Sequence, residues 1–243
     1  MITLYDLGLI KTPKEWGMSP FVRRVMFTLN YKKIPFELIQ LPLEGLEPKA
    51  KSLGALPTKH IDGSSKYTVP IIHDSRTGKV LSDFFLIAEY LDEAYPDTPK
   101  VFPPGTRALQ KVFNDAVLMK FAPLIALYLD RIIDYDASPV IQVALAKRFG
   151  AFPPQLTDEQ RAEAWKQVEA SLNELGSAYE TAGGVFVMGD KPVFADFSLA
   201  GLFANIKLSF GEESEEWKRT SQWIGGRFGK VVEAAMKYER AQK

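Results

Sequence analysis

The stretch KEWGMSPFVRRVMFTLNYKKIPFE, residues 14–37, decides how the first part of the chain folds. After Ser19 and Pro20, apolar residues recur at the spacing of one helix face, at Val22, Val25, Met26 and Leu29. A serine cap followed by proline is a common way to begin a helix. The start of a helix also offers unpaired N–H groups and partial positive charge, which favour an anion. Ser19 is therefore either a helix cap alone or also a hydrogen-bond donor to a bound thiolate or phosphate.

Strands and helices alternate before the proline-rich segment 97–105. The predicted strands are residues 2–7, 36–41, 67–73 and 79–82, and the predicted helices are residues 20–33, 43–53 and 83–95. This alternation favours a parallel or mixed sheet that is covered by helices.

The segment 97–105 (DTPKVFPPG) contains three prolines, which predict a stiff linker. Only helices are predicted beyond it, at residues 106–134 with a kink at Pro123, 157–179, 196–208 and 229–239. The second of these opens with a capping box formed by Thr157 and Gln160. The sequence therefore predicts an α/β domain over residues 1–96, a linker, and an all-helical domain over residues 106–243.

The composition excludes several classes of function. Lys plus Arg and Asp plus Glu each number 30, so the formal net charge is zero and no field draws nucleic acid or an anionic membrane. The chain has no cysteine, which excludes disulfides, thiolate metal sites and cysteine nucleophiles, and no metal site is expected. The first residues lack the basic start of a signal peptide, and the most apolar run, 117–129, is too short to span a bilayer. A cytoplasmic protein is therefore expected.

Two further positions each allow an ordinary and a functional interpretation. Pro70 cannot donate to a sheet. Val69-Pro70 is therefore either an edge position with a trans bond or a cis bond that turns the Val69 backbone toward a peptide ligand. Asp83 is either an acidic helix cap or part of a helix start that holds the charged end of a ligand.

These segments resemble a known family. ITLYDL, SPFVRRVMFTLNYKKIPFE, YTVPII and SDFFLIAEYLDEAYPDTP, in this order, resemble the thioredoxin-like N-terminal domain of cytosolic glutathione transferases. The segment GDKPVFADFSLAGL looks like part of that family's helical C-terminal domain. The resemblance covers nearly the whole chain and looks closest to the fungal-specific A class, which is related to bacterial lignin β-etherases.

The resemblance implies a binding site for glutathione as co-substrate. Ser19 stands where the family supports the glutathione thiolate, and Val69, before Pro70, stands where the cysteinyl backbone is paired. Asp83 and Phe84 stand where the γ-glutamyl end is held. Trp16, in the loop before Ser19, is a candidate wall of the cleft.

Two residues depart from the family pattern. Phe84 replaces a serine, so one hydroxyl contact to the γ-glutamyl carboxylate is missing, and its ring either faces the cleft or points into the core. Val193 replaces a serine or threonine three residues before Asp196, which removes half of a capping box.

The leading hypothesis is a glutathione transferase that acts on small hydrophobic, aromatic electrophiles. The electrophile is expected between the two domains, in a site formed by Phe21, Phe113, Val117 and Tyr128. The absence of cysteine excludes the branch with a catalytic cysteine, which leaves conjugation or attack on an aryl ether. The alternatives are a weakly catalytic or non-catalytic binding protein (ligandin) for aromatic compounds, which Phe84 favours, and a purely structural interaction domain. A homodimer is expected, because an exposed sheet edge and helix face gain from a partner.

Overall fold

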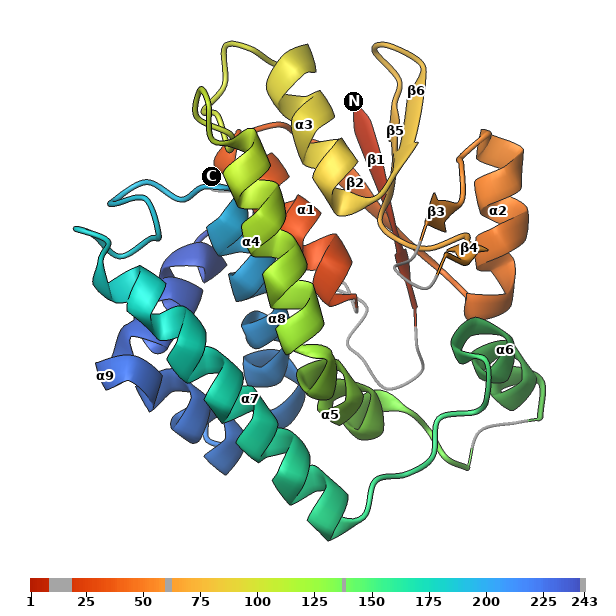
Figure 1. The fold of residues 1–243 in the computed structure, drawn as a ribbon. Helices are drawn as coiled ribbons and strands as arrows, with labels where there is room; N and C mark the ends of the chain where they lie inside the picture. Colours follow the sequence, from red (N-terminus) through yellow and green to blue (C-terminus); the bar gives the residue numbers. More distant parts are fainter. Residues whose placement is uncertain (9–18, 60–62, 137–138, 241–243) are drawn as a thin grey trace.

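The computed structural model of the chain describes residues 1–8, 19–59, 63–136 and 139–240. A mixed sheet with helices on both sides forms the first unit, and helices form the second (Figure 1). The thioredoxin-like domain followed by a helical domain is therefore confirmed.

The first unit is built on a sheet with the strand order β2-β1-β5-β6. Its main elements are β1 (Ile2–Leu7), α1 (Pro20–Tyr31), β2 (Phe36–Leu41), α2 (Leu46–Leu53), β5 (Ile71–Asp74), β6 (Lys79–Ser82) and α3 (Phe84–Ala94). β1 pairs in parallel with β2 and antiparallel with β5, which pairs antiparallel with β6. Helices α1 and α3 lie on one side of the sheet and α2 lies on the other (Figure 1). A 3-10 turn (Leu43–Gly45) and a small hairpin of β3 (Thr58–Lys59) and β4 (Ser65–Lys66) complete the unit.

The second unit is arranged around a central helix. Its elements are α4 (Arg107–Lys120), α5 (Ala122–Ile132), α6 (Pro139–Phe149), α7 (Asp158–Glu180), α8 (Phe194–Phe210) and α9 (Glu215–Met236). Helix α8 contacts α1, α4, α5 and α9, and its residues from Phe194 to Ile206 are all buried. No single helix of the described residues is long and apolar enough to cross a membrane, and only α4 with α5, bent by 56°, would pass as a pair.

The structure corrects the predicted helix over residues 106–134. The chain forms two helices that are separated at Phe121, and Pro123 lies in the first turn of the second helix. A proline in the first turn loses no hydrogen bond, because the N–H groups there have no partner in the helix. Pro123 therefore helps to begin α5 instead of kinking one long helix.

Two helical segments were not predicted. Helix α6 packs against the 3-10 turn of the first unit, and Lys147 Nζ lies 3.1 Å from Glu47 Oε2. Helix α9 begins at Glu215 rather than near Gly229, and it is interrupted from Trp223 to Gly226 by residues with non-helical angles. The predicted capping box is confirmed at the start of α7, and the helix ends close to the predicted end.

Asp196 anchors the start of α8. Its Oδ2 accepts the Val193 N–H at 2.9 Å, while Oδ1 accepts the Val187 N–H at 2.8 Å and the Tyr179 hydroxyl at 3.1 Å. Burial raises the pKa of Asp196 to about 6, although these three hydrogen bonds favour the carboxylate. Val193 has no side-chain acceptor, so the predicted loss of half the capping box is confirmed.

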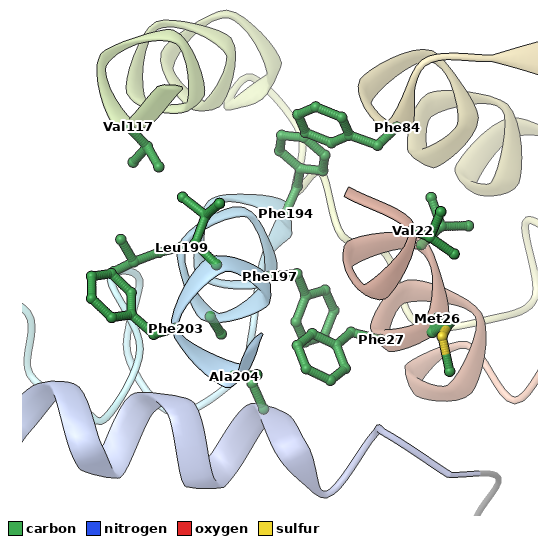
Figure 2. Close-up of a cluster of buried hydrophobic side chains, with 14 of the residues drawn as sticks. Val22, Met26, Phe27, Phe84, Val117, Phe194, Phe197, Leu199, Phe203 and Ala204 are labelled. Carbon is green, nitrogen blue, oxygen red and sulfur yellow. The ribbon is translucent and has the colours of Figure 1, made fainter. Parts of the chain in front are cut away.

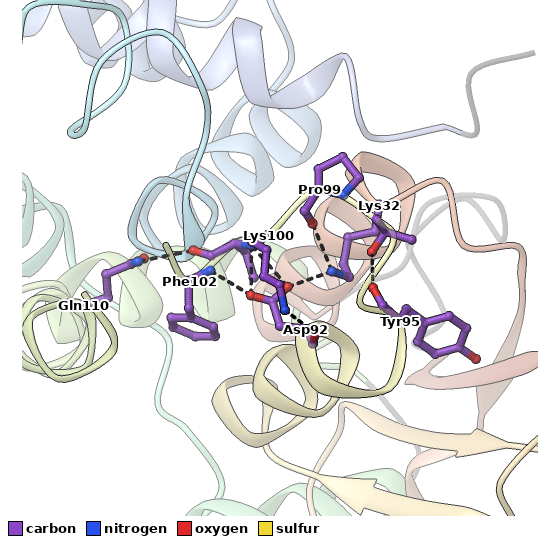
Figure 3. Close-up of polar contacts among 9 residues, drawn as sticks. Lys32, Asp92, Tyr95, Pro99, Lys100, Phe102 and Gln110 are labelled. Carbon is purple, nitrogen blue, oxygen red and sulfur yellow. Dashed lines mark hydrogen bonds and ion pairs between the residues drawn. The ribbon is translucent and has the colours of Figure 1, made fainter. Parts of the chain in front are cut away.

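The linker between the two units is anchored by Asp92 of α3 (Figure 3). The Asp92 carboxylate accepts hydrogen bonds from Lys32 Nζ at 2.6 Å and from the Phe102 N–H at 2.9 Å. Lys32 also donates to the Pro99 carbonyl at 2.9 Å. Lys32 and Asp92 are both buried, and removing their charges from water is costly. The added hydrogen bonds offset part of that cost.

Helices α1 and α8 approach most closely at Gly201. A Cβ atom at Gly201 would lie 2.6 Å from Arg24 Cγ and 2.9 Å from the Pro20 carbonyl oxygen. One turn before Gly201 in α8, the ring of Phe197 lies 5.8 Å from the ring of Phe27 in α1 (Figure 2). The absent side chain of Gly201 therefore allows the first helix of one unit to dock against the central helix of the other.

Gly201→Ala should lower the free energy of unfolding by about 1–3 kcal/mol, because the added methyl group pushes α1 away from α8. The loss should outweigh the gain of about 1 kcal/mol in helix propensity from glycine to alanine. Denaturant unfolding measures it, with Gly183→Ala as the control because nothing lies within 4 Å of a Cβ there. A Gly201→Ala protein as stable as the parent would contradict the close docking.

Candidate functional site

Ser19 caps α1 and still has a hydrogen to donate. Its Oγ accepts the Phe21 N–H at 3.3 Å, and its own N–H points at the Asp6 carboxylate, 3.3 Å from Oδ1. The serine is 7% exposed, and its hydroxyl hydrogen is bonded to no described residue. Both interpretations of Ser19 are thus compatible: it is a cap, and its O–H can donate to an anion at the helix start.

Asp6 supports this helix start and was missed by sequence reasoning. It is fully buried at the end of β1 and accepts the N–H groups of Leu7 and Ser19. Burial lowers the pKa of Arg23 to about 10, and the nearby negative charge of Asp6 acts in the opposite direction. An acidic residue in the otherwise apolar strand ITLYDL was the signal that could have identified it.

Arg23 connects this region to the second unit. Its guanidinium donates to Asn205 of α8 and forms an ion pair with Glu239 beyond α9. Tyr128 of α5 lies near the same charges, and burial raises its pKa, while hydrogen bonds with Asn205 and Ser209 lower it. The structure therefore places Tyr128 in a buried polar cluster close to the Ser19 helix start.

The Val69-Pro70 bond is cis, as the functional interpretation of the sequence predicts. Pro70 precedes β5, an inner strand of the sheet, so the edge interpretation is wrong. The backbone N–H and C=O of Val69 bond to no described residue. They remain available to pair with an extended ligand.

Asp83 caps α3 in an unusual backbone conformation. Its φ of 78° lies in the left-handed region, which residues other than glycine adopt rarely and at a cost. Its Oδ1 accepts the N–H groups of Phe85 at 2.8 Å and Leu86 at 3.2 Å. Phe84 follows the cap directly, and its N–H bonds to no described residue. The start of α3 therefore offers one free amide beside one carboxylate.

The Phe84 ring points into the contact between the two units. It is 6% exposed and stacks on Phe194 of α8 at 5.6 Å (Figure 2). The Phe21 ring of α1 lies 5.8 Å away. Of the two orientations considered from the sequence, the structure has the one in which the ring is in the core. The amide of Phe84, not its ring, is the part that faces a ligand.

Arg24 lies beneath Phe84 and was also missed by sequence reasoning. Its guanidinium carbon is 4.5 Å from the centre of the Phe84 ring and 4.9 Å from that of Phe21. Its three side-chain nitrogens are buried and make no hydrogen bond with any described residue. Burial lowers the pKa of Arg24 to about 9, and the charge of Asp83 acts in the opposite direction. Two adjacent arginines on a largely apolar helix were the available signal.

The four residues expected to form a hydrophobic ligand site do not all lie together. Phe21 is half-buried beside Phe84, and Tyr128 joins the polar cluster near Ser19. Val117 is fully buried and points toward Leu199 (Figure 2). The Phe113 ring lies 6.3 Å from the Tyr179 ring. Trp16 lies outside the described residues. Among the described residues no group of three metal-ligating side chains occurs.

Phe84→Ser should lower the free energy of unfolding by about 3 kcal/mol or more, since it removes a fully packed ring and leaves a cavity beside Arg24. Glu93→Ser, at an exposed position of the same helix, should change it by about 0.5 kcal/mol or less. Thermal and urea unfolding of the two variants would show the difference. Equal effects would contradict the burial of Phe84.

Comparison with known proteins identifies relatives of the chain. The patterns of two protein families match it: glutathione S-transferase, N-terminal domain, over residues 18–94, and glutathione S-transferase, C-terminal domain, over residues 106–238. The glutathione transferase GSTFuA2 from Phanerochaete chrysosporium is 33% identical, with a TM-score of 0.83 over 99% of each chain. A glutathione S-transferase of Ceriporiopsis subvermispora, crystallised in complex with glutathione, is 30% identical, with a TM-score of 0.84 over 100% of this chain and 99% of that one.

A curated relative is also fungal. The glutathione S-transferase-like protein ustS of Aspergillus flavus is 27% identical over 95% of this chain and 87% of its own length. The resemblance inferred from the sequence is therefore confirmed at the level of the family.

Proposed function

The chain belongs to the glutathione S-transferase family, and on this premise we propose that it transfers glutathione to small hydrophobic, aromatic electrophiles, with Ser19 stabilising the thiolate. The observation that carries the proposal is the O–H of Ser19, which has no partner among the described residues. Ser19 lies at the start of α1, on the same side of the sheet as the start of α3. A thiolate there would accept the Ser19 hydrogen and lie in the positive field of the helix.

The start of α1 could lower the pKa of the glutathione thiol by the amount that catalysis needs. A free thiol has a pKa of about 8.5, so about 3% is thiolate near pH 7. A pKa of about 6.5 would raise the thiolate fraction to about 75%, which corresponds to about 2.7 kcal/mol. A hydrogen bond to a charged acceptor contributes about 1.5–3 kcal/mol, and a helix N-terminus adds about 0.3–1 kcal/mol.

The rest of glutathione fits the remaining free groups. The unbonded backbone of Val69 would pair with the cysteinyl residue, as an added strand pairs with a sheet edge. The γ-glutamyl end would lie at the start of α3, with its ammonium at Asp83 and its carboxylate at the Phe84 amide. The relative from Ceriporiopsis subvermispora, which was crystallised with glutathione, supports glutathione as the ligand.

We propose conjugation, or attack on an aryl ether, as the chemistry, in a cytoplasmic and detoxifying enzyme. A ligandin that binds aromatic compounds with little turnover is the second candidate. It is favoured because Phe84 has no hydroxyl to hold the γ-glutamyl carboxylate of glutathione. A parent protein that binds glutathione and an aromatic ligand but does not join them would favour the ligandin.

Ser19→Ala should lower turnover about tenfold or more, because the thiolate loses a charge-assisted hydrogen bond. The acidic limb of the pH–rate profile should move to higher pH, since a less stabilised thiolate forms only at higher pH. The matched control is Ser214→Ala, which removes another serine cap, at the start of α9. If the pH profile of Ser19→Ala overlays that of the parent, Ser19 is only a cap.

We also propose that the protein is a homodimer that pairs through α3 and α4. Leu109, Val112 and Met119 of α4 are 73%, 68% and 69% exposed and lie on one face of the helix, and Leu86 of α3 is 50% exposed. Arg107 of α4 pairs with Glu89 of α3, so the two helices present a joint surface. A surface of this kind usually has a partner.

Sedimentation at micromolar concentration should give twice the chain mass of 27.2 kDa. Val112→Glu should give the mass of one chain, because a charge is placed in an apolar contact. Val143→Glu on α6, at a site that is 69% exposed, should leave the dimer intact. A parent protein that sediments as a single chain would remove the proposal.

A further inference from the structure

Four helices of the second unit surround a cavity of about 400 Å³. The side chains that line it include Asp130 and Arg131 of α5, Arg161 and Trp165 of α7, Phe210 of α8 and Glu216 of α9. Its volume lies within the range of about 300–1,000 Å³ that is typical of small-molecule sites. Ser19, Val69, Asp83 and Phe84 do not line it. The cavity is therefore separate from the candidate site at the starts of α1 and α3.

One wall of the cavity is aromatic. The Trp165 ring lies 6.3 Å from the Phe210 ring and 6.4 Å from the ring of Trp223, which is buried. Trp165 and Phe210 are only half-buried, so part of each ring is open to a ligand in the cavity. Aromatic rings pack favourably on one another in offset or edge-to-face arrangements. This wall therefore favours a ligand that carries an aromatic ring.

Two charged groups of the cavity are already paired within the protein. Arg161 forms an ion pair with Asp130, and Asp130 Oδ1 also accepts the Leu156 N–H at 2.8 Å. Arg161 Nη2 lies 3.3 Å from Asp158 Oδ1 as well. These contacts join α5 to the start of α7, so the two groups serve the fold.

Two other charged groups of the cavity have no ionic partner among the described residues. Arg131 donates from Nε to the Ser209 carbonyl at 3.4 Å, and its guanidinium carbon lies 5.7 Å from the centre of the Phe210 ring. The Nη1 and Nη2 atoms of Arg131 bond to no described residue, and neither does the carboxylate of Glu216. The cavity thus presents one unused cation and one unused anion that do not pair with each other.

We propose that this cavity is a second ligand site, which binds a zwitterionic aromatic compound of the size of an aromatic amino acid. The ring packs on Trp165 and Phe210, the carboxylate accepts hydrogen bonds from Arg131, and the ammonium donates to Glu216. The inference goes beyond the proposed transfer of glutathione and does not rest on it.

The charge balance of the cavity favours a zwitterion over a simple aromatic acid or amine. Arg131 and Arg161 carry two positive charges, and Asp130 and Glu216 carry two negative ones, so these four groups are neutral together. An aromatic acid would leave Glu216 unpaired and be repelled by it, and an aromatic amine would do the same at Arg131. A ligand with both charges on one carbon satisfies both groups and adds no net charge to a partly buried space.

Calorimetry with three ligands that share a phenyl ring tests the site. Phenylalanine carries both charges, 3-phenylpropanoate lacks the ammonium, and 2-phenylethylamine lacks the carboxylate. The parent protein should bind phenylalanine about tenfold more tightly than either of the others, because each of them lacks one charge-assisted contact. Saturating glutathione should change the affinity for phenylalanine by less than about twofold, because the two sites share no residue.

Two variants separate the two charged contacts. Arg131→Gln should bind phenylalanine and 2-phenylethylamine within about twofold of each other, and should keep the preference over 3-phenylpropanoate. Glu216→Gln should bind phenylalanine and 3-phenylpropanoate alike, and should keep the preference over 2-phenylethylamine. The matched control is Arg219→Gln, at an exposed arginine of α9 that does not line the cavity, and it should keep both preferences.

The position of the ring is tested separately. Trp165→Phe keeps an aromatic wall, so it should still bind phenylalanine within about threefold of the parent. Most of the change in tryptophan fluorescence that phenylalanine causes in the parent should be lost in this variant. An unchanged fluorescence response would contradict a ring at Trp165.

Several results would overturn the second site. The parent could show no binding of phenylalanine up to about 10 mM, or it could bind the three ligands equally. Competition between phenylalanine and glutathione would place the ligand at the Ser19 site instead. Parent-like preferences in Arg131→Gln and Glu216→Gln would contradict the two charged contacts. A parent that binds phenylalanine with these preferences but does not bind glutathione would remove the proposed function and support the second site.

Discussion

Helices α1 and α8 approach each other so closely at Gly201 that no side chain fits between them. This contact holds the sheet unit against the helical unit, and it fixes the start of α1, where the cap residue Ser19 faces the proposed thiolate. It also confines Arg24, whose stem passes Gly201 and whose guanidinium ends under Phe84. The position of the candidate site therefore depends on the absence of one methyl group in a helix of the other unit.

Charge is distributed unevenly beneath the two helix starts that bound the site. Below α1, the buried Asp6 accepts the Ser19 N–H, and Arg23 balances its charge. Below α3, Arg24 balances Asp83 without any hydrogen bond of its own. The first arrangement is satisfied within the protein, whereas the second leaves donors unused. The first arrangement fixes the backbone at the start of α1, whereas Arg24 is held beneath the Phe84 and Phe21 rings.

Local features of the sequence were predicted well, and contacts between distant segments were not. The Ser19 cap and the Thr157 capping box depend on neighbouring residues, so short motifs reveal them. The cis bond before Pro70 was one of two alternatives that the motif left open. The burial of Phe84 depends on Phe194, more than 100 residues away, and no periodicity shows that pairing. Helix α6 was missed because its support comes from the 3-10 turn of the other unit. Asp6 and Arg24 were visible as charges in apolar segments, but their partners were not.

The pKa of the thiol of bound glutathione tests most directly whether the start of α1 stabilises a thiolate. It can be followed by the ultraviolet absorbance of the thiolate while the pH of the complex is raised. A stabilised thiolate should titrate near pH 6.5, roughly two units below the value of about 8.5 for a free thiol. A bound thiol that titrates at about 8.5 or above would contradict the role assigned to Ser19 and to its helix.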